Sequence, residues 1–166
     1  MRSFGFPRLQ NRNFYFKSGL TYSVVSSGRV SARLMPEGWI FGHKGSAAFA
    51  EDSSTSELFL LGYLNSALAT YFMKRIVNTT ADIGYVEKLP YRRPGAELEA
   101  AVIERVGQII EALKADPEAD VQAPRAEIDD LIFNLFEIRS SRDEVRRFYR
   151  TVGRVEQPEE DQAAIE

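Results

Sequence analysis

Short hydrophobic runs separated by turn residues make up the first half of the chain. Val, Thr and aromatic residues are frequent in these runs, and Gly or Pro interrupts them, as in Ser27-Gly28 and Pro36-Glu37-Gly38. Such runs are typical of short antiparallel strands. We therefore expect a small antiparallel or mixed sheet. The runs that predict its strands are residues 14–16, 20–26, 29–34, 39–41 and 47–49.

The pattern changes to a helical period after residue 57. Apolar residues then recur every three or four positions, which places them on one face of a helix. One of Ser54, Thr55 and Ser56 can cap this helix, and we expect one packed central helix. A returning strand is predicted for residues 83–89. The apolar face of the helix consists of Leu58, Leu61, Leu64, Leu68, Phe72 and Ile76.

The second half of the chain has helical periodicity throughout. An apolar stripe from Leu98 to Leu113 predicts a helix over residues 96–114, and Asp116-Pro117 ends it. Two further helices are expected over residues 125–137 and 142–152.

These elements predict an α+β protein: a small antiparallel or mixed sheet with one packed central helix, followed by a helical C-terminal appendage. We expect four parts along the chain. They are an N-terminal extension (1–10), an α+β module (11–95), a helical bracing or docking segment (96–152) and an acidic disordered tail (153–166).

The formal net charge of −3 conceals a division between the two halves. Residues 1–95 contain twelve Lys and Arg against six Asp and Glu, a balance of +6, whereas residues 96–166 contain nine against eighteen, a balance of −9. A basic half joined to an acidic half suggests that the basic half binds an anion. Two separately solvated modules would have the same composition, so the charge alone leaves both interpretations open.

The composition excludes several kinds of chemistry. The chain has no cysteine and one histidine, His43, which excludes a disulfide scaffold, a thiolate zinc site and a cysteine nucleophile. No apolar stretch reaches the ~18 residues of a membrane-spanning helix. Residues 1–10 lack the apolar region of a secretory signal. We therefore expect a cytoplasmic protein with no metal site and no membrane partner.

Two motifs look chemical but have simpler interpretations. In Gly42-His43-Lys44-Gly45-Ser46 the lysine precedes the glycine, whereas a phosphate-binding loop needs the reverse order, so we expect a hairpin turn. Asp129-Asp130 precedes an apolar helical run, and carboxylates in a first turn favour the helix dipole, so we expect a solvated pair. No nucleophile, base and oxyanion donors can be assembled. The chain on its own is therefore not expected to be an enzyme.

Aromatic and basic residues are interleaved through the predicted strands and turns. Arginine and lysine neutralise phosphates, arginine also binds guanine edges, and tyrosine packs on a sugar or base. The pattern therefore suggests nucleic-acid binding, with an aromatic core and a solvated basic face as the structural alternative. The interleaved residues are Phe14, Tyr15, Phe16, Lys17, Tyr22, Arg29, Arg33 and Lys44.

Several short motifs occur in an order that resembles a known family. They are the aromatic entry at 14–16, Lys17-Ser18-Gly19 before Tyr22, Pro36-Glu37-Gly38 before Phe41, Leu64-Asn65-Ser66 on the helix, Thr79-Thr80 in the next loop, and Leu89-Pro90. This arrangement is similar to the target recognition domain of adenine-specific DNA methyltransferases, both fused restriction–modification enzymes and phage-exclusion methyltransferases. A helix after such a Leu-Pro is also usual in the specificity subunits of type I restriction systems.

A later segment extends the resemblance to about residues 11–152. In the family, an Ile-Asp-x-Leu helix with an aromatic-rich end leads into a short acidic helix, and Ile128-Asp129-Asp130-Leu131 followed by Leu135-Phe136 fits this pattern. The family's usual Tyr-Gly-Leu at the helix end is replaced by Phe136-Glu137-Ile138. Because glycine there would terminate the helix, we expect a different C-cap.

The resemblance implies sequence-specific recognition of double-stranded DNA without catalysis by this chain. Family enzymes carry a methyltransferase domain with a glycine-rich cofactor loop and an Asn-Pro-Pro-Tyr/Phe motif, and this sequence has no Asn-Pro-Pro. The resemblance therefore places S-adenosylmethionine in that separate domain and implies no cofactor here. The expected partners are duplex DNA and a methyltransferase or restriction catalytic domain or subunit.

Charge and loop position, rather than the family, select the candidate DNA contacts. We expect base-edge contacts from Arg33, Asn78, Thr79 and Thr80, and a sugar or base contact from Tyr22. Phosphate contacts are expected from Lys17, Arg29, Lys44, Lys74 and Arg75. As an alternative function, the C-terminal helices would form a protein-interaction module. Their Leu98–Leu113 stripe would then pair with a partner helix or, weakly, with a second copy of the chain.

Overall fold

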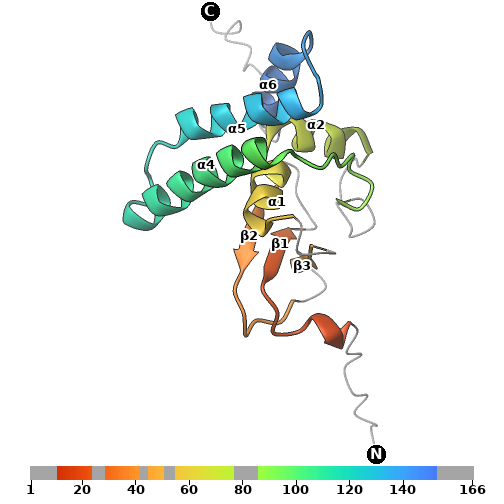
Figure 1. Cartoon of the computed structure of the whole chain (residues 1–166), viewed down its shortest axis with the longest axis vertical. Coiled ribbons are helices and arrows are strands. Elements are labelled where there is room, and N and C mark those ends of the chain that lie inside the picture. The colour runs from red at the N-terminus through yellow and green to blue at the C-terminus, as the bar shows by residue number, and fades with distance from the viewer. Residues whose placement is uncertain (1–10, 24–28, 42–44, 51–54, 77–85, 153–166) are drawn as a thin grey trace, which may run out of the picture.

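A three-stranded sheet lies at one end of the molecule and the helices lie at the other (Figure 1). The computed structural model describes residues 11–23, 29–41, 45–50, 55–76 and 86–152, so the predicted N-terminal extension and acidic tail lie outside the described residues. The predicted α+β class with a helical C-terminal part is confirmed. The elements are η1 (Arg12–Phe14), β1 (Gly19–Ser23), β2 (Ala32–Met35), β3 (Gly45–Ala48), α1 (Glu57–Leu64), α2 (Ala67–Ile76), α4 (Ala96–Ala115), α5 (Gln122–Leu135) and α6 (Arg142–Thr151).

Strand β1 is the centre of an antiparallel sheet with the order β2-β1-β3. Its residue Leu20 pairs with Leu34 of β2 on one side and with Ala48 of β3 on the other. Leu20 and Tyr22 are buried in the core, while Thr21 between them is only partly buried. This alternation is the period-two pattern of a sheet with one covered face.

The helix predicted over residues 58–76 is divided into α1 and α2, with Asn65 and Ser66 between them. Asn65 Oδ1 accepts the N–H of Ala32 at 3.0 Å and its Nδ2 donates to the Ala32 carbonyl at 3.1 Å, so Asn65 binds the free edge of β2. Ser66 Oγ accepts the N–H of Ala69 at 3.2 Å, which caps α2. The apolar period continues across the break, and for this reason the hydrophobic pattern did not reveal it.

Three predicted strands are wrong. The aromatic run 14–16 lies in and just after η1, and residues 39–41 form no strand. Residues 86–89, the described part of the run 83–89, form a turn in which the N–H of Leu89 donates to the Val86 carbonyl at 3.1 Å. Aromatic residues favour strands because their rings pack on neighbouring side chains. Here Phe14, Tyr15 and Phe41 pack ring to ring with each other or with Phe49 outside a strand, while Trp39 and Ile40 remain exposed.

The predicted C-terminal helices are confirmed, with a shifted boundary in α5. This helix begins at Gln122, so Pro124 lies in its first turn, where a missing N–H costs no intrahelical bond. Past its end, Glu137 has a φ of 57° and the N–H of Ile138 donates to the Phe133 carbonyl at 2.9 Å. Glu137 thus adopts the left-handed conformation that glycine would adopt. None of the described helices combines the length and apolarity of a membrane span.

One hydrophobic core joins the sheet to the helices of both halves. Its completely buried members include Phe59 of α1, Val102 of α4 and Phe133 of α5. Helices α1 and α4 approach closely at Gly62, where an added Cβ would lie 2.8 Å from Cγ1 of Val102. The helical segment from residue 96 therefore shares its core with the predicted α+β module and is fixed relative to the sheet.

Candidate nucleic-acid interface

The candidate DNA contacts that the structure describes are spread over the molecule. Lys17 lies between η1 and β1, and Arg33 lies on β2, four residues after Arg29. Lys74 and Arg75 are in the last turn of α2, at the helical end. The other candidates fall outside the described residues: Lys44, Asn78, Thr79 and Thr80.

Tyr22 lies in the core rather than on a binding surface. Its exposed fraction is 4%, and it occupies the covered face of β1 with Leu20. In this position its ring has almost no surface to offer a nucleotide, so we assign it a packing role. Residues 20 and 22 share one face of a strand because side chains alternate. That alternation is the sequence signal that could have shown its burial.

We define the tip as residues 11–17 and 36–41, which meet at the far end of the sheet. The N–H of Phe16 donates to the Trp39 carbonyl at 3.0 Å, and the N–H of Gly38 donates to the Phe16 carbonyl at 3.1 Å. Phe16 has a φ of 66°, in the left-handed region that bulky residues seldom adopt. Backbone strain of this kind costs ~1–3 kcal/mol and concentrates at functional sites.

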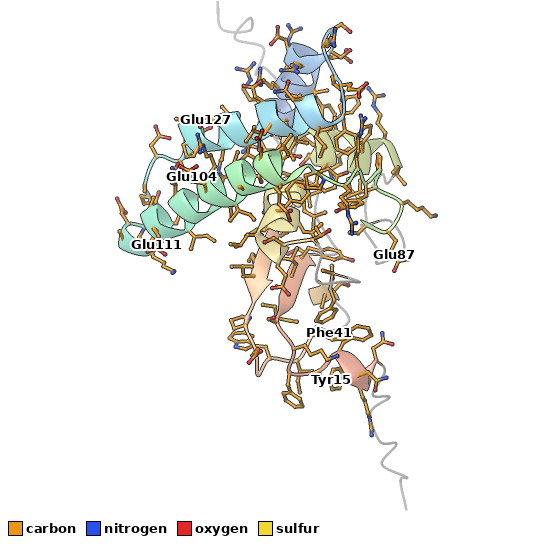
Figure 2. All side chains as sticks on the ribbon, in the orientation of Figure 1. Tyr15, Phe41, Glu87, Glu104, Glu111 and Glu127 are labelled. Carbon is orange, nitrogen blue, oxygen red and sulfur yellow. The ribbon has the colours of Figure 1, made fainter. Side chains whose placement is uncertain are left out.

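Aromatic rings both brace the tip and form its surface. The rings of Tyr15 and Phe41 meet edge to face with centroids 5.4 Å apart, and Phe41 lies 5.8 Å from Phe49 (Figure 2). Large apolar side chains that remain exposed together mark a binding surface. The exposed fractions are 59% for Phe16, 63% for Trp39 and 57% for Ile40.

The sheet and the tip are cationic. The ammonium of Lys17 lies 5.5 Å from the ring centroid of Phe14, and the exposed Arg33 donates to Ser23 Oγ at 3.3 Å. A cationic surface with exposed rings suits a polyanion that also presents flat apolar groups. The described charged residues of the sheet and the tip are Arg12, Lys17 and Arg33, against the single acid Glu37, whereas Arg29, before β2, lies against Tyr149 of α6.

The two cations of α2 belong to the helical end. The Arg75 guanidinium lies 5.0 Å from the ring centroid of Tyr71 and donates to its hydroxyl at 3.2 Å. Tyr71 packs edge-on against Phe148 of α6, with centroids 5.4 Å apart. Partial burial lowers the pKa of Lys74. Packing of Tyr71 against α6 thus holds Arg75 at the helical end.

A cleft of about 660 Å³ lies between β2, the α1–α2 turn, α4, α5 and α6, and we call it the arginine cleft. Two of its arginines come from the basic half of the sequence and three from the acidic half. The charged lining residues are Arg29, Arg33, Arg125, Arg146, Arg150 and Asp129. The floor is aliphatic and includes Leu61, Val106, Ile109, Ile110, Leu113 and Ile128.

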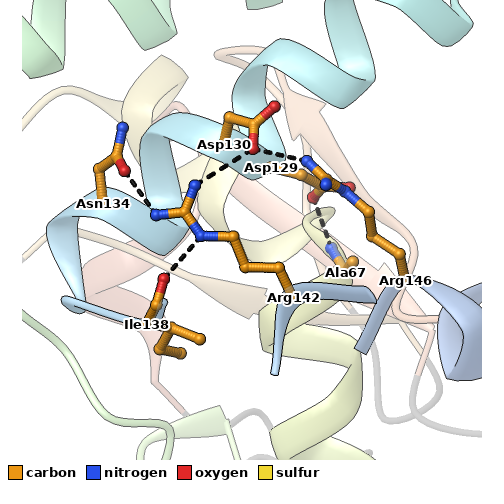
Figure 3. Close-up of polar contacts among 7 residues, drawn as sticks. All are labelled: Ala67, Asp129, Asp130, Asn134, Ile138, Arg142 and Arg146. Carbon is orange, nitrogen blue, oxygen red and sulfur yellow. Dashed lines mark hydrogen bonds and ion pairs between the residues drawn. The ribbon is translucent and has the colours of Figure 1, made fainter. Parts of the chain in front are cut away.

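The pair Asp129-Asp130 lies in the middle of α5, so its predicted position in a first turn is wrong. The Asp130 side chain is half exposed, as predicted for a solvated residue, whereas the Asp129 carboxyl is partly buried. Asp129 Oδ1 accepts the N–H of Ala67, the first residue of α2, at 2.8 Å (Figure 3). Burial raises the pKa of Asp129 to about 6, although this hydrogen bond and the nearby Arg146 act in the opposite direction. The approach of α2 to α5 buries this carboxyl.

Asp130 instead joins α5 to α6. Its Oδ1 is 2.6 Å from the Arg146 guanidinium and 3.4 Å from that of Arg142 (Figure 3). Arg142 also donates to Asn134 Oδ1 at 2.6 Å, and both guanidiniums lie over the Phe133 ring. This network fixes Arg146 at the cleft. Within the described ranges, no three His, Asp or Glu side chains are grouped so that they could hold a metal ion.

Two features were missed from the sequence. Trp39 and Ile40 were assigned to a strand, and only the structure shows them exposed at the tip. The arginines of α5 and α6 were counted with the acidic half. Their signal was partly present, because residues 146 and 150 are four apart on one predicted helix and share a face. The local sequence pattern does not show that this face meets the arginines near β2.

Comparisons with known proteins agree with part of the resemblance. No protein-family model matches the chain. It is 35% identical over 108 residues to the adenine-specific methyltransferase PglX of Lacticaseibacillus casei (strain Zhang), covering 64% of this chain and 9% of that protein. It is 36% identical over 84 residues to the adenine-specific methyltransferase BrxX of Escherichia coli O9:H4 (strain HS), covering 49% and 7%. The chain is similar to a part of these methyltransferases. The matched segment spans less than a tenth of either relative.

Proposed function

We propose that this chain is the sequence-specific DNA recognition module of an adenine methyltransferase of the restriction–modification or phage-defence type. The observation that carries the proposal is the tip, where the exposed rings of Phe16 and Trp39 lie in the cationic part of the chain. The similarity to two adenine-specific methyltransferases supports DNA as the ligand. The proposed role is binding and does not include catalysis.

In this proposal, phosphate contacts position the module and a few side chains read the bases. Arg12 and Lys17 are the cations of the tip and would neutralise phosphates, while Trp39 packs on a sugar or base. The exposed guanidinium of Arg33, now 3.3 Å from Ser23 Oγ, can exchange this contact for O6 and N7 of a guanine.

The acidic residues favour one orientation on DNA. Figure 2 shows Glu104, Glu111 and Glu127 on α4 and α5, away from the tip. Each has a basic neighbour: Glu127 lies 2.8 Å from Arg105, and Glu111 lies 2.8 Å from Lys114. Helix α4 as a whole is nevertheless acidic, with four glutamates against Arg105 and Lys114. Phosphates repel such a surface, so the tip would approach the duplex first.

Methyl transfer would belong to a partner domain or subunit. The resemblance places the Asn-Pro-Pro motif and S-adenosylmethionine there, and S-adenosylmethionine supplies the methyl group. This chain would hold the target duplex in register with that domain. Its own residues would therefore determine which sequence is methylated and not the rate of the chemical step.

The single tryptophan of the chain lies at the tip and provides a direct test. Titration with duplex DNA should quench Trp39 emission, because a base or sugar then covers the exposed ring. If about three phosphates are neutralised, the logarithm of the association constant should fall against log salt with a slope of about −2.7. Unchanged emission together with no gel retardation at low salt would contradict the proposal.

Single substitutions distinguish the proposed phosphate contacts from the proposed base contact. Lys17→Ala should weaken all duplexes alike and reduce the salt slope by ~1. Arg33→Ala should also relax base preference, with a loss of ~1–3 kcal/mol on the preferred sequence. Lys74→Ala should weaken binding less than Lys17→Ala and leave base preference unchanged. Lys114→Ala, which alters an exposed lysine of α4, is the matched control and should have no effect.

A further inference from the structure

We infer that the arginine cleft is a docking site for an acidic amphipathic helix of a protein partner. The inference is independent of DNA binding at the tip. It rests on the apolar floor of the cleft, on the charge of its lining and on the way the arginines are held.

The floor continues the apolar stripe of α4 beyond the core. In the first half of the stripe, Val102 is 0% exposed and Val106 is 4% exposed. In the second half, Ile109, Ile110 and Leu113 are only partly buried and line the cleft. These positions repeat at three- and four-residue spacing, which is the surface against which another helix packs. The cleft thus presents half a helix–helix interface.

The charge of the lining selects an acidic occupant. Five arginines line the cleft, and the described lining includes one carboxylate, that of Asp129. Its Oδ1 accepts the N–H of Ala67 at 2.8 Å. Arginine pairs with carboxylates through two parallel hydrogen bonds. Asp or Glu residues on both sides of an apolar stripe would therefore complement this lining, whereas Lys or Arg would be repelled.

Two of the arginines are held in place before any partner binds. The Arg29 guanidinium lies 4.3 Å from the ring centroid of Tyr149, and its Nε donates to the Tyr149 carbonyl at 3.0 Å. Arg146 is held by Asp130 at 2.6 Å. Groups fixed in this way lose little conformational entropy on binding, which favours affinity.

The chemistry of the floor favours a helix over a nucleic acid. Bases bind by stacking on aromatic rings. Among the described lining residues, Tyr149 is the one aromatic side chain, and the guanidinium of Arg29 already covers it. An aliphatic floor fits the Leu, Ile and Val anchors that a helix presents at positions i, i+3, i+4 and i+7.

Selection from a displayed library of helical peptides with randomised surface positions tests the specificity of the cleft. The full chain is the target, and the doubly reversed variant Arg125→Glu, Arg150→Glu is used for counter-selection. The enriched peptides should carry an aliphatic stripe flanked by Asp and Glu. No enrichment over the counter-selected pool, or enrichment of basic peptides, would overturn the inference.

The affinities of one selected peptide for substituted variants of the chain locate its binding surface. The double charge reversal should weaken binding about tenfold or more. Arg147→Glu is the matched control, because Arg147 is exposed on α6 and does not line the cleft. The affinity of the peptide for this variant should not change. Ile110→Ser tests the floor without changing charge and should also weaken binding about tenfold. An equal loss of peptide affinity in Arg147→Glu and in the double variant would overturn the assignment of the binding site to the cleft.

Trp39 emission separates this inference from the proposed DNA function. A peptide in the cleft should leave Trp39 emission unchanged, because the ring lies at the tip. The peptide-saturated chain should still bind duplex DNA through the tip and should lose no more affinity than the Arg33→Ala variant, because Arg33, a proposed base contact, also lines the cleft. Displacement of the peptide by single- or double-stranded DNA would overturn the inference and assign the cleft to nucleic acid. A chain that binds the peptide but not DNA would leave the inference standing and would refute the proposed function.

Discussion

The tip and the arginine cleft both place cations beside apolar side chains, but the chain builds them differently. The tip consists of two short segments joined by backbone hydrogen bonds at Phe16, and its apolar side chains are mainly aromatic and exposed. The cleft is assembled from strand β2 and four helices around an aliphatic floor. We therefore expect that the tip can change without loss of the fold, whereas the cleft forms only when the helices pack correctly.

Removal of one ring from each region should give the largest contrast. Phe133 is 0% exposed beneath Arg142 and Arg146, so Phe133→Ala should lower the free energy of unfolding by about 3–5 kcal/mol through the cavity it leaves. Trp39→Ala removes a ring that is 63% exposed and should change this energy by less than about 0.5 kcal/mol. Urea denaturation followed by circular dichroism measures both. Similar losses of unfolding free energy in the two variants would show that the tip is part of the core.

The close approach of α1 and α4 makes the cleft region sensitive to one added methyl group. Gly62→Ala would place a Cβ 2.8 Å from Val102 Cγ1 and 3.0 Å from Val106 Cγ2, so we expect a loss of about 1–3 kcal/mol. Gly107→Ala is the matched control, because its added Cβ has nothing within 4 Å, and replacing a helical glycine should stabilise by about 0.5–1 kcal/mol. Thermal and urea unfolding measure the stability of both variants. A change of stability in the same direction in both would contradict this geometry.

Asp129 links the stability of the cleft region to pH. Its pKa is raised from 3.8 to about 6 by burial, so between these values the folded protein holds a proton that the unfolded chain has released. The free energy of unfolding therefore falls as pH rises through this window, in total by on the order of 3 kcal/mol. Asp129→Asn keeps an oxygen that can accept the Ala67 N–H and removes the titration. It should be more stable than the wild type at pH 7, and identical pH profiles of the two proteins would refute the assignment.

The smallest expected effect on stability concerns the strained residue of the tip. Phe16→Gly relieves the cost of φ at 66° and should stabilise the fold by up to about 1 kcal/mol, since glycine adopts this region freely. The same variant lacks the exposed ring and should bind DNA more weakly. Phe16→Ala is the control, because it removes the ring but keeps the strain, and it should lose affinity without gaining stability. Retention of full DNA affinity by both variants would remove Phe16 from the interface.

Much of the helical framework was predictable because a helix records its buried face in the local spacing of apolar residues. Helices α4 and α6 begin at Ala96 and Arg142, as the apolar periodicity predicted. The break at Asn65 was not predictable in this way. It depends on an amide that binds Ala32 of β2, a residue 33 positions earlier in the chain.

Of the candidate site, only the types of residue were predictable from the sequence. The interleaving of aromatic and basic residues identified the segment from Phe14 to Lys17, which the structure places at the tip. It also included Tyr22, which is buried. Residue type indicates what a side chain can bind, but burial depends on what the rest of the chain packs against.

Local spacing and composition were enough to predict the class of fold, the extent of the C-terminal helices and the cationic character of the strand-rich part. The packing of distant segments, which local spacing does not show, brings arginines from the basic and acidic halves into one cleft and partly buries Asp129 against the start of α2. The physical reason is that charge and burial act through distances in space, and those distances are fixed only when the whole core has packed.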